Sequence, residues 1–487
     1  MRVAAQFCID PVGVVSDDGC VTALPRAECL VLSSRLVPGL DGGYTIATMQ
    51  RARHMAAAGV DNGRGPWLLT VDPGSRVEHD AHRAEFVRRG MLADGERLRN
   101  LFGAAGAGAG AGAGPADWLR AAARPGELAP DLPYRTVMDA AGHPLIDLPV
   151  IAGDADWHLS TAPVGVWGER GVIGVLDGFG GLYRAWLEHV VAGLRDAAGD
   201  AERPVVVICE SRQLGELLVP FTVPGVRIVH TVHTAHTEPP HTPDALLNAL
   251  WSRWFGVMDA FDAVLWLTQS QADAVAERFG ARDTFAVVPH PAEPVASPRP
   301  AAERTPGRVV MLNRLAPGKR VDHAIRAFVR VAAAVPGARL DIYGDGPLRQ
   351  ELDALIDELG LRGVVTLRGH VDAASAELDD AALLLLTTAF EGQGLVVVEA
   401  LSHGCPVISY DVGYGPHDML SGGGGLLVPS GDVEALAETL IEVLADAALR
   451  ERLSVEAVAA AQEMDVEASM SVLADAVARA LDGPSRR

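Results

Sequence analysis

Residues 308–432 alternate between short apolar runs and segments with the composition of helices. The apolar runs are VVMLNR, ARLDIYG, VVTLRG, ALLLLT and PVISYD, and most of them end in glycine or another turn-forming residue. Apolar runs of this length, separated by helices, are typical of a parallel sheet with helices on both of its faces. This half of the chain is therefore predicted to be a doubly wound α/β domain.

One turn in this domain, between residues 387 and 395, is suited to binding an anion. It follows the apolar run 382–387 and leads through Gly392 and Gly394 into the helix-like segment LVVVEALSHG. Ligands bind at the carboxyl ends of parallel strands, and glycines let a phosphate approach the N–H groups at a helix start closely. Glu391 and Glu399 lie on either side of the turn, so one carboxylate can face a bound group from the loop and the other from the helix.

A second α/β domain is expected earlier in the chain. CLVLSS at 29–34 and WLLTVD at 67–72 predict strands, and Gly42 and Gly43 form a turn between them that a ligand can approach. The same pattern resumes with VVVICE, RIVHTV and AVLWLT between residues 205 and 268. Between the two parts, short alternating pieces broken by Gly, Pro and Asp indicate an antiparallel meander.

These patterns give four expected regions. Residues 1–28 form a tail, and residues 29–73 and 201–295 form the first α/β domain. Residues 74–200 form a separable β-rich insertion, and residues 308–487 form the second domain after a proline-rich linker at 296–307. The Gly/Ala run at 103–114 lacks the side chains to build a core and is expected to be a flexible loop without an assigned role.

Composition limits the classes of function. The 487 residues carry a net charge of -22, which argues against binding nucleic acid and against electrostatic attraction to an anionic membrane. The five cysteines show no metal-binding spacing, and their odd number does not suggest a disulfide framework. The first residues lack the apolar core of a signal peptide, and no apolar run is long enough to span a bilayer. A cytoplasmic protein is expected.

Arg314 and Lys319 form a local cationic pair in this acidic chain. They lie five residues apart in NRLAPGKRVDHAIRAF, after a strand and before a helix. A guanidinium binds phosphate oxygens through two N–H groups, and an ammonium adds a second positive charge. Together these side chains are expected to neutralise a diphosphate leaving group.

The glutamate pair separated by seven residues in EGQGLVVVEAL, followed by GCPVISYD, resembles the nucleotide-sugar signature of retaining GT-B glycosyltransferases of family four. The segments DIYGDGPLRQEL and VTLRGHVD also resemble segments of that family. The segment SYDVGYGPHDML resembles the corresponding segment of the subgroup that modifies teichoic acid polyol-phosphate polymers and serine-rich adhesins. The resemblance is specific in the second domain and loose before Arg227. It implies two Rossmann-like domains that face a cleft, with a β-rich insertion in the first.

The resemblance also implies roles for individual residues. It assigns Glu399 to the ribose, Glu391 to the sugar, the main chain at His370 and Val371 to the uracil, and Arg314 and Lys319 to the diphosphate. Other expected donor contacts come from the two glycine turns and the following helix start: Gly42, Gly43, Gly392, Gly394 and Leu395. His230 is implied to be the active-site histidine that faces the sugar, with His233 second to it.

The expected function is transfer of a hexose or N-acetylhexosamine from a UDP-sugar to a hydroxyl of a cell-wall polymer or protein, with retention of configuration. No cofactor or metal is expected, although the histidines at 230, 233, 236 and 241 have spacings that zinc could use. Self-association through the insertion is a further expectation. The alternatives are a catalytically silent partner subunit and a sugar-phosphate synthase or glycogen-type transferase that uses an ADP-sugar. A dehydrogenase would need a GxGxxG turn that the first strand lacks.

Overall fold

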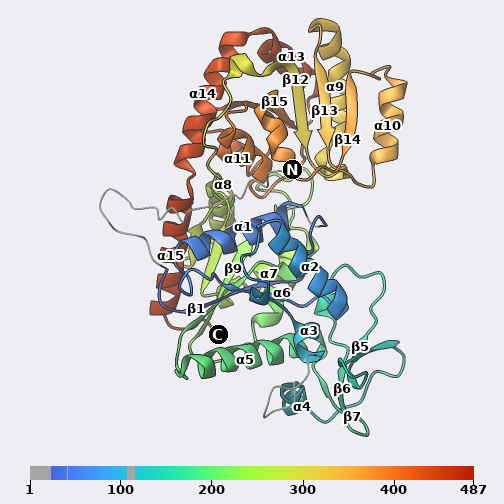
Figure 1. The fold of residues 1–487 in the computed structure, drawn as a ribbon, viewed down its shortest axis with the longest axis vertical. Helices are drawn as coiled ribbons and strands as arrows, with labels where there is room; N and C mark the ends of the chain where they lie inside the picture. Colours follow the sequence, from blue (N-terminus) through green and yellow to red (C-terminus); the bar gives the residue numbers. More distant parts are fainter. Residues whose placement is uncertain (1–23, 41, 107–115) are drawn as a thin grey trace, which may run out of the picture.

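The computed structural model describes residues 24–40, 42–106 and 116–487, and shows two α/β domains stacked along the long axis of the molecule (Figure 1). The upper domain in that view contains a six-stranded sheet in which every strand pair is parallel. Its order across the sheet is β14 (Val365–Gly369), β13 (Arg339–Tyr343), β12 (Thr305–Leu312), β15 (Ala381–Leu386), β16 (Val407–Asp411) and β17 (Gly425–Pro429). The alternating pattern of the second half is thereby confirmed.

The lower domain contains a seven-stranded sheet that is also parallel throughout. Its order is β11 (Phe285–Val287), β10 (Ala263–Trp266), β9 (Val226–Val232), β8 (Val205–Cys209), β1 (Glu28–Ser33), β2 (Trp67–Thr70) and β3 (Leu98–Asn100). Both β8 and β15 are buried along their whole length, because helices cover both faces of a parallel sheet. This is why these strands appear in the sequence as unbroken apolar runs.

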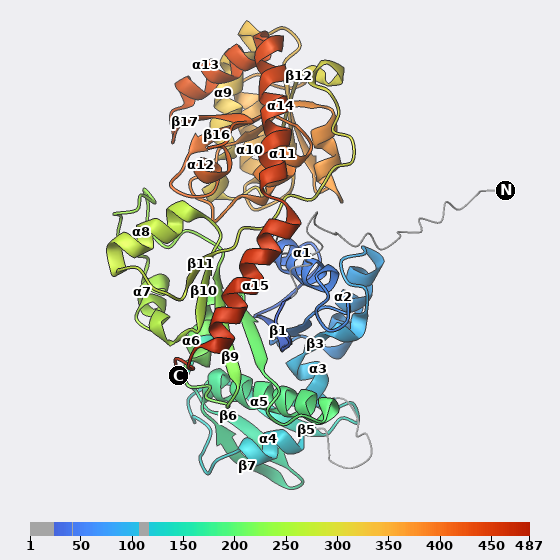
Figure 2. The same ribbon diagram turned by 90° about the vertical axis from the view of Figure 1, so that its left-hand side faces the viewer.

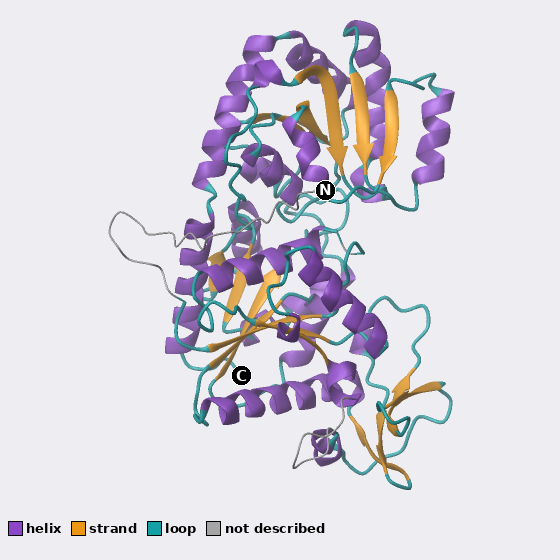
Figure 3. Cartoon of the chain, in the orientation of Figure 1, coloured by secondary structure: helices purple, strands orange, loops and turns teal. Residues whose placement is uncertain are grey.

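Helices flank both sheets (Figure 3). Those before the domain linker are α1 (Gly43–Ala57), α2 (Arg76–Arg88), α3 (Leu101–Gly106), α4 (Asp117–Ala122), α5 (Gly178–Ala198), α6 (Arg212–Leu218), α7 (Ala249–Phe255) and α8 (Gln269–Phe279). Those after it are α9 (Val321–Ala334), α10 (Arg349–Glu358), α11 (Leu395–Ser402), α12 (Pro416–Met419), α13 (Val433–Ala445), α14 (Ala447–Glu463) and α15 (Val466–Asp482).

The insertion is antiparallel, as expected, but it is smaller than predicted and is not separable. Its sheet has the order β4 (Tyr134–Met138), β5 (Pro144–Pro149), β6 (Val164–Gly168) and β7 (Gly171–Leu176). The boundary expected at residue 74 is wrong, because β3 pairs with β2 in the first sheet. Ile146 and Val166 share one apolar core with Leu30 and Val207 of that sheet, so the insertion and the first domain pack as one unit.

The last helix packs on the first domain, although the second domain was expected to include it. α14 runs along the second domain, but α15 continues onto the first domain and covers its sheet (Figure 2). Leu473 and Val477 of α15 share a core with Val31 and Ile208, and Arg227 donates hydrogen bonds to the main chain at the end of the helix. The second domain therefore ends near residue 464 rather than at 487, because the apolar face of α15 is buried against the other sheet.

Two sequence-based expectations lie outside the described residues in whole or in large part, namely the tail before residue 24 and the Gly/Ala run, of which 107–115 are not described. Among the helices that the structure does describe, none combines the length and the apolar character that a bilayer crossing requires.

Candidate functional site

The glycine turn between β15 and α11 lies where the two domains meet. Gly394 adopts a φ of 85° at the start of α11, a conformation that favours glycine. At Gly392, an added Cβ would lie 2.2 Å from the carbonyl oxygen of His233 in the first domain. Only glycine allows the two domains to approach this closely, so Gly392 helps to set the width of the cleft.

The first domain contributes its own glycine turn to the same place. An ideal Cβ on Gly43, at the start of α1, would lie 3.6 Å from Cδ1 of Leu395, the first residue of α11. The two helix starts therefore face one another across the cleft. Gly42, Gly43, Gly392, Gly394 and Leu395, which the sequence analysis selected, are brought together.

Lys319 and Glu391 are in direct contact. The Lys319 ammonium donates to Oε1 of Glu391 at 2.5 Å, and both side chains are partly buried. The Thr387 hydroxyl at the end of β15 donates to the carbonyl oxygens of Lys319 and Arg320, each at 2.9 Å, and so fixes the turn that carries Lys319. The ion pair holds a cation and a carboxylate at the same edge of the sheet.

Arg314 is exposed at the end of β12, and its guanidinium makes no hydrogen bond or ion pair with the part of the chain that the structure describes. Because the charge is not neutralised by a neighbour, it is available to an anion in solution. His370 and Val371 follow β14 at the same edge of the sheet, where the strands have their carboxyl ends, and both residues are exposed.

Glu399 lies inside α11 with no hydrogen-bond partner for its carboxyl group among the described residues. Burial raises the pKa of Glu399 to about 7, far above that of an ordinary glutamate. A partly buried carboxyl without a partner is suited to accept hydrogen bonds from a ligand hydroxyl, and it accepts them best when ionised.

This pKa gives a testable pH dependence. If Glu399 holds the ribose of UDP, as the resemblance implies, UDP should bind about tenfold more tightly at pH 8 than at pH 6, because the ionised fraction of a group with a pKa of about 7 rises about tenfold over that interval. Calorimetric titration at both pH values measures the change. Glu399→Gln is the control, since the phosphate of UDP also titrates near pH 6 and that contribution remains in the variant. An equal pH dependence in both proteins would remove the role of Glu399.

The structure does not bring His230 to the cleft. Its side chain is fully buried in the first domain against Trp254, whose indole N–H donates to Nε2, and against Phe261. Burial lowers the pKa of His230 to about 3, so the ring is a neutral core residue. The expectation that His230 faces a sugar is therefore wrong. His230 lies within β9, which ends at Val232, and its side chain points under helix α6, where it contacts Gly215.

His233, just beyond the end of β9, occupies the cleft instead. Its Nε2 lies 2.5 Å from Oε2 of Glu210, and its ring packs edge-on against Tyr44. Burial alone would raise the pKa of Glu210, but the Arg51 guanidinium, 2.8 Å from its other oxygen, and His233 hold that pKa below its ordinary range. Glu210 is therefore a buried anion that orients His233.

Neither Glu210 nor Arg51 was selected from the sequence. Glu210 follows the apolar strand β8 directly, and a carboxylate at the carboxyl end of a parallel strand is a signal that could have identified it. Arg51 gave no comparable signal, because it lies within α1 and its partner is far away in the chain.

Two polar contacts join the domains beside the site. The Gln393 amide in the glycine turn donates to the carbonyl oxygen of His290 and accepts from its N–H, at 2.8 and 2.7 Å. On the other side, Asp418 accepts from the main-chain N–H of Ser270 at 2.9 Å and from its hydroxyl. The glycine turn and α12 are thus tied to the first domain.

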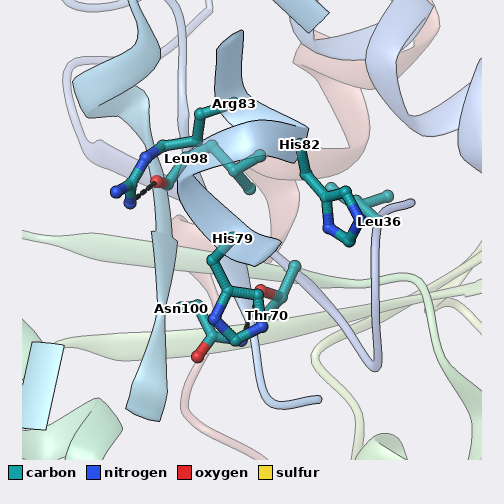
Figure 4. Close-up of a pocket in the computed structure, with 7 residues that line it drawn as sticks. All are labelled: Leu36, Thr70, His79, His82, Arg83, Leu98 and Asn100. Carbon is teal, nitrogen blue, oxygen red and sulfur yellow. Dashed lines mark hydrogen bonds between the residues drawn. The ribbon is translucent and has the colours of Figure 1, made fainter. Parts of the chain in front are cut away.

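A cavity of about 460 Å³ lies between the two domains beside Ser270, and its volume is within the range typical of small-molecule sites. Both domains line it, the first with Ala235, residues 240–243 and Ser270, and the second with residues 389–391, 411–414 and others nearby. Glu391 forms part of its wall. A second hollow, beside His79 and Asn100 of the first domain (Figure 4), has only about 10 Å³ and holds at most one water.

The histidines that zinc could use are separated in space. His230 lies in the core, His233 pairs with Glu210, His236 stacks on Tyr414, and His241 lies in the wall of the cavity. Within the described residues, no group of three or more His, Cys, Asp or Glu side chains is arranged to hold a metal ion.

Part of the second domain matches a known protein family. Residues 296–459 match the model of the family described as glycosyl transferases group 1. The chain is 32% identical over 208 residues to a poly(glycerol-phosphate) alpha-glucosyltransferase of Bacillus subtilis, and the match covers 42% of this chain and 30% of that relative. The chain thus spans less than a third of this relative's length.

Solved structures match almost the whole chain. A mutant of TarM from S. aureus, in complex with Fondaparinux, alpha-GlcNAc-glycerol and UDP, superposes with a TM-score of 0.71 at 15% identity, over 93% of this chain and 99% of TarM. The pneumococcal O-GlcNAc transferase GtfA, in complex with UDP and GlcNAc, gives 0.70 at 16% identity, over 94% and 100%. At such low identity these matches show the fold. The protein therefore has the GT-B fold, and residues 296–459, most of its second domain, are similar to the glycosyl transferases group 1 family.

Proposed function

We propose that the protein is a retaining glycosyltransferase that moves a hexose or N-acetylhexosamine from a UDP-sugar to a hydroxyl of a cell-wall polymer or protein in the cytoplasm. The observation that carries the proposal is the cationic pair of Arg314 and Lys319. Both residues follow strand β12, at the same edge of the sheet as the glycine turn that precedes α11. Solved proteins of the same fold hold UDP, which supports a uridine nucleotide as the leaving group.

In the proposed reaction, the bond from the anomeric carbon to the diphosphate oxygen breaks as the acceptor oxygen attacks from the same face. The acceptor proton passes to the departing diphosphate, and UDP leaves. Arg314, Lys319 and the N–H groups at the start of α11 stabilise the negative charge that develops on the diphosphate. Glu391 stabilises the positive charge that develops on the sugar ring, and Glu399 holds the ribose.

His233 takes the place beside the sugar that the sequence analysis gave to His230. Its Nε2 is turned toward Glu210, and a carboxylate accepts, so this nitrogen carries the proton and Nδ1 remains to face the cleft. Arg51 and Glu210 are positioning residues that fix this orientation.

A panel of UDP-sugars tests the proposal. Incubation of the full chain with each donor, followed by mass detection of free sugar and UDP, should reveal hydrolysis of at least one donor. A catalytically silent partner subunit would turn over no donor. Failure to bind UDP in a calorimeter would refute the transferase function and favour the silent partner.

Activity should survive an excess of EDTA, because the two cationic side chains neutralise the diphosphate in place of a metal ion. The measurement is the rate of donor hydrolysis before and after chelation, and then with added manganese. A rate that collapses with EDTA and returns with manganese would contradict the proposal.

The insertion is proposed to mediate self-association or acceptor docking. Its edge strands β4 and β7 carry exposed apolar side chains, with Met138 at 51% and Ile173 at 54% exposure. Met138→Lys combined with Ile173→Lys should lower the oligomeric mass measured by light scattering. Val455→Lys, at an exposed apolar position on α14 with 62% exposure, is the matched control. An unchanged mass together with unchanged polymer glycosylation would remove this role.

A further inference from the structure

A buried ion pair connects strands β12 and β13 of the second domain. The Arg308 guanidinium donates to Oδ2 of Asp341 at 3.0 Å and to the Tyr343 hydroxyl at 2.9 Å. The side chains of Arg308 and Asp341 are only 7% and 3% exposed. Replacing such a pair by apolar side chains is often neutral or stabilising, so stability alone does not account for it.

The pair is connected to the start of the loop that follows β14. Arg368, the residue before Gly369, is the extra residue of a β-bulge, because the pairing between β13 and β14 shifts there. A β-bulge changes the direction of a side chain. Here Nε of Arg368 donates to Oδ1 of Asp341 at 2.9 Å, and Nη2 lies 2.8 Å from the same oxygen. One oxygen of Asp341 thus holds Arg368, and the other holds Arg308.

The same pair is connected to the far end of this loop through Glu377. This residue belongs to the short 3-10 helix Ala374–Asp379, which begins directly after the loop. Arg308 donates to a carboxylate oxygen of Glu377 and, at 3.3 Å, to its carbonyl oxygen. Both ends of the loop of residues 369–373 are therefore fixed to one buried ion pair.

The loop itself adopts a strained conformation. Gly369 has a φ of 80°, and Ala373 has a φ of 55°, which an alanine rarely adopts. Such a conformation persists only where the surrounding structure fixes it, and it is common at ligand sites. His370 and Val371, whose main chain the sequence analysis assigned to the uracil, lie between these two residues and are exposed.

We propose that the four charged side chains of this network are positioning residues for the nucleobase of the donor. They are Arg308, Asp341, Arg368 and Glu377, and we call them the loop clamp. Because the clamp fixes both ends of the loop before binding, the nucleotide does not have to order the loop. The inference rests on the proposed function, with the uracil at His370 and Val371 as the sequence analysis expects.

The two outer members of the loop clamp provide the test, since removal of Arg308 or Asp341 would leave a buried charge unpaired and destabilise the domain. Arg368→Ala and Glu377→Ala each release one end of the loop, while the buried pair stays intact. Each variant should bind UDP about tenfold more weakly in calorimetric titration, which is the cost of ordering about one residue.

Arg339→Ala is the matched control. The Arg339 side chain is 42% exposed, against 46% for Arg368, and it also lies near Asp341, at 3.8 Å from Oδ2. However, it is at the start of β13, at the opposite end of the strand from the loop. Its UDP affinity should equal that of the unchanged protein. Equal UDP affinity in Arg368→Ala, Glu377→Ala and the control would overturn the inference.

Donor hydrolysis distinguishes positioning from general damage to the site. Contacts to the nucleobase are the same in the bound donor and in the transition state, so the two clamp variants should raise KM for the UDP-sugar and leave kcat unchanged. A loss confined to kcat would overturn the inference. Without donor hydrolysis by the unchanged protein the proposed transferase function fails, but the UDP affinities of the three variants still decide the role of the loop clamp.

Discussion

Replacing either Arg314 or Lys319 by alanine is expected to lower turnover by about a hundredfold, which corresponds to about 3 kcal/mol in the activation barrier. Arg314 is exposed at a strand end with no partner among the described residues, and the Lys319 ammonium is shared only with Glu391. The Arg314 guanidinium is therefore available to a departing diphosphate, and the Lys319 ammonium can add to it when a diphosphate competes with Glu391 for its N–H groups. The effect should fall on kcat, because the negative charge on the leaving group grows as the bond breaks.

Arg330→Ala is the control for charge. It removes a guanidinium of the same domain that lies on α9 and pairs with Glu434 and Glu438 on the surface. Its turnover should match that of the unchanged protein, and all three variants should unfold at similar temperatures. Full turnover in Arg314→Ala or Lys319→Ala would show that the leaving group is stabilised elsewhere.

Glu391→Gln and Glu399→Gln should fail in different ways. Glu399→Gln should weaken UDP and UDP-sugar about equally, by about 1 to 3 kcal/mol at pH 8, where the carboxylate is ionised and accepts charge-assisted hydrogen bonds. Glu391→Gln should reduce the rate at saturating donor by about a hundredfold, because it removes a negative charge beside the sugar ring.

The two variants are compared by UDP affinity and by turnover. UDP should bind Glu391→Gln at least as tightly as before, since the change releases Lys319 from its ion pair and leaves the ammonium free for phosphate. Loss of UDP affinity with turnover retained in Glu391→Gln would show that the two carboxylates have the reverse roles or neither role.

The second domain was predictable because each of its strands is a short apolar run and each turn carries glycine. The glycine turn of residues 392–394 and the two glutamates beside it could be identified in the sequence as individual residues. For the histidines, the sequence selected His230, whereas the residue at the cleft is His233, three positions later. Strand ends are uncertain by one or two residues in a sequence, and β9 ends between His230, which is buried under α6, and His233, which reaches the cleft.

The sequence patterns do not predict which segments far apart in the chain contact one another. The amphipathic pattern of α15 shows that one face must be buried, but it does not tell which sheet covers that face. β3 is only three residues long, so it gave no apolar run that would assign it to the first sheet. The Gln393–His290 and Ser270–Asp418 contacts connect residues more than a hundred positions apart, and neither polar pair has a local signature.

The return of α15 to the first domain has a consequence for biosynthesis. A sheet that begins at residue 28 is covered by a helix that ends at residue 482, so the chain must be synthesised through residue 482 before the first domain can close its core. Domains usually fold from the N-terminus onward during synthesis. The apolar surface around Val31 and Ile208 is therefore expected to stay open to chaperones until α15 has left the ribosome.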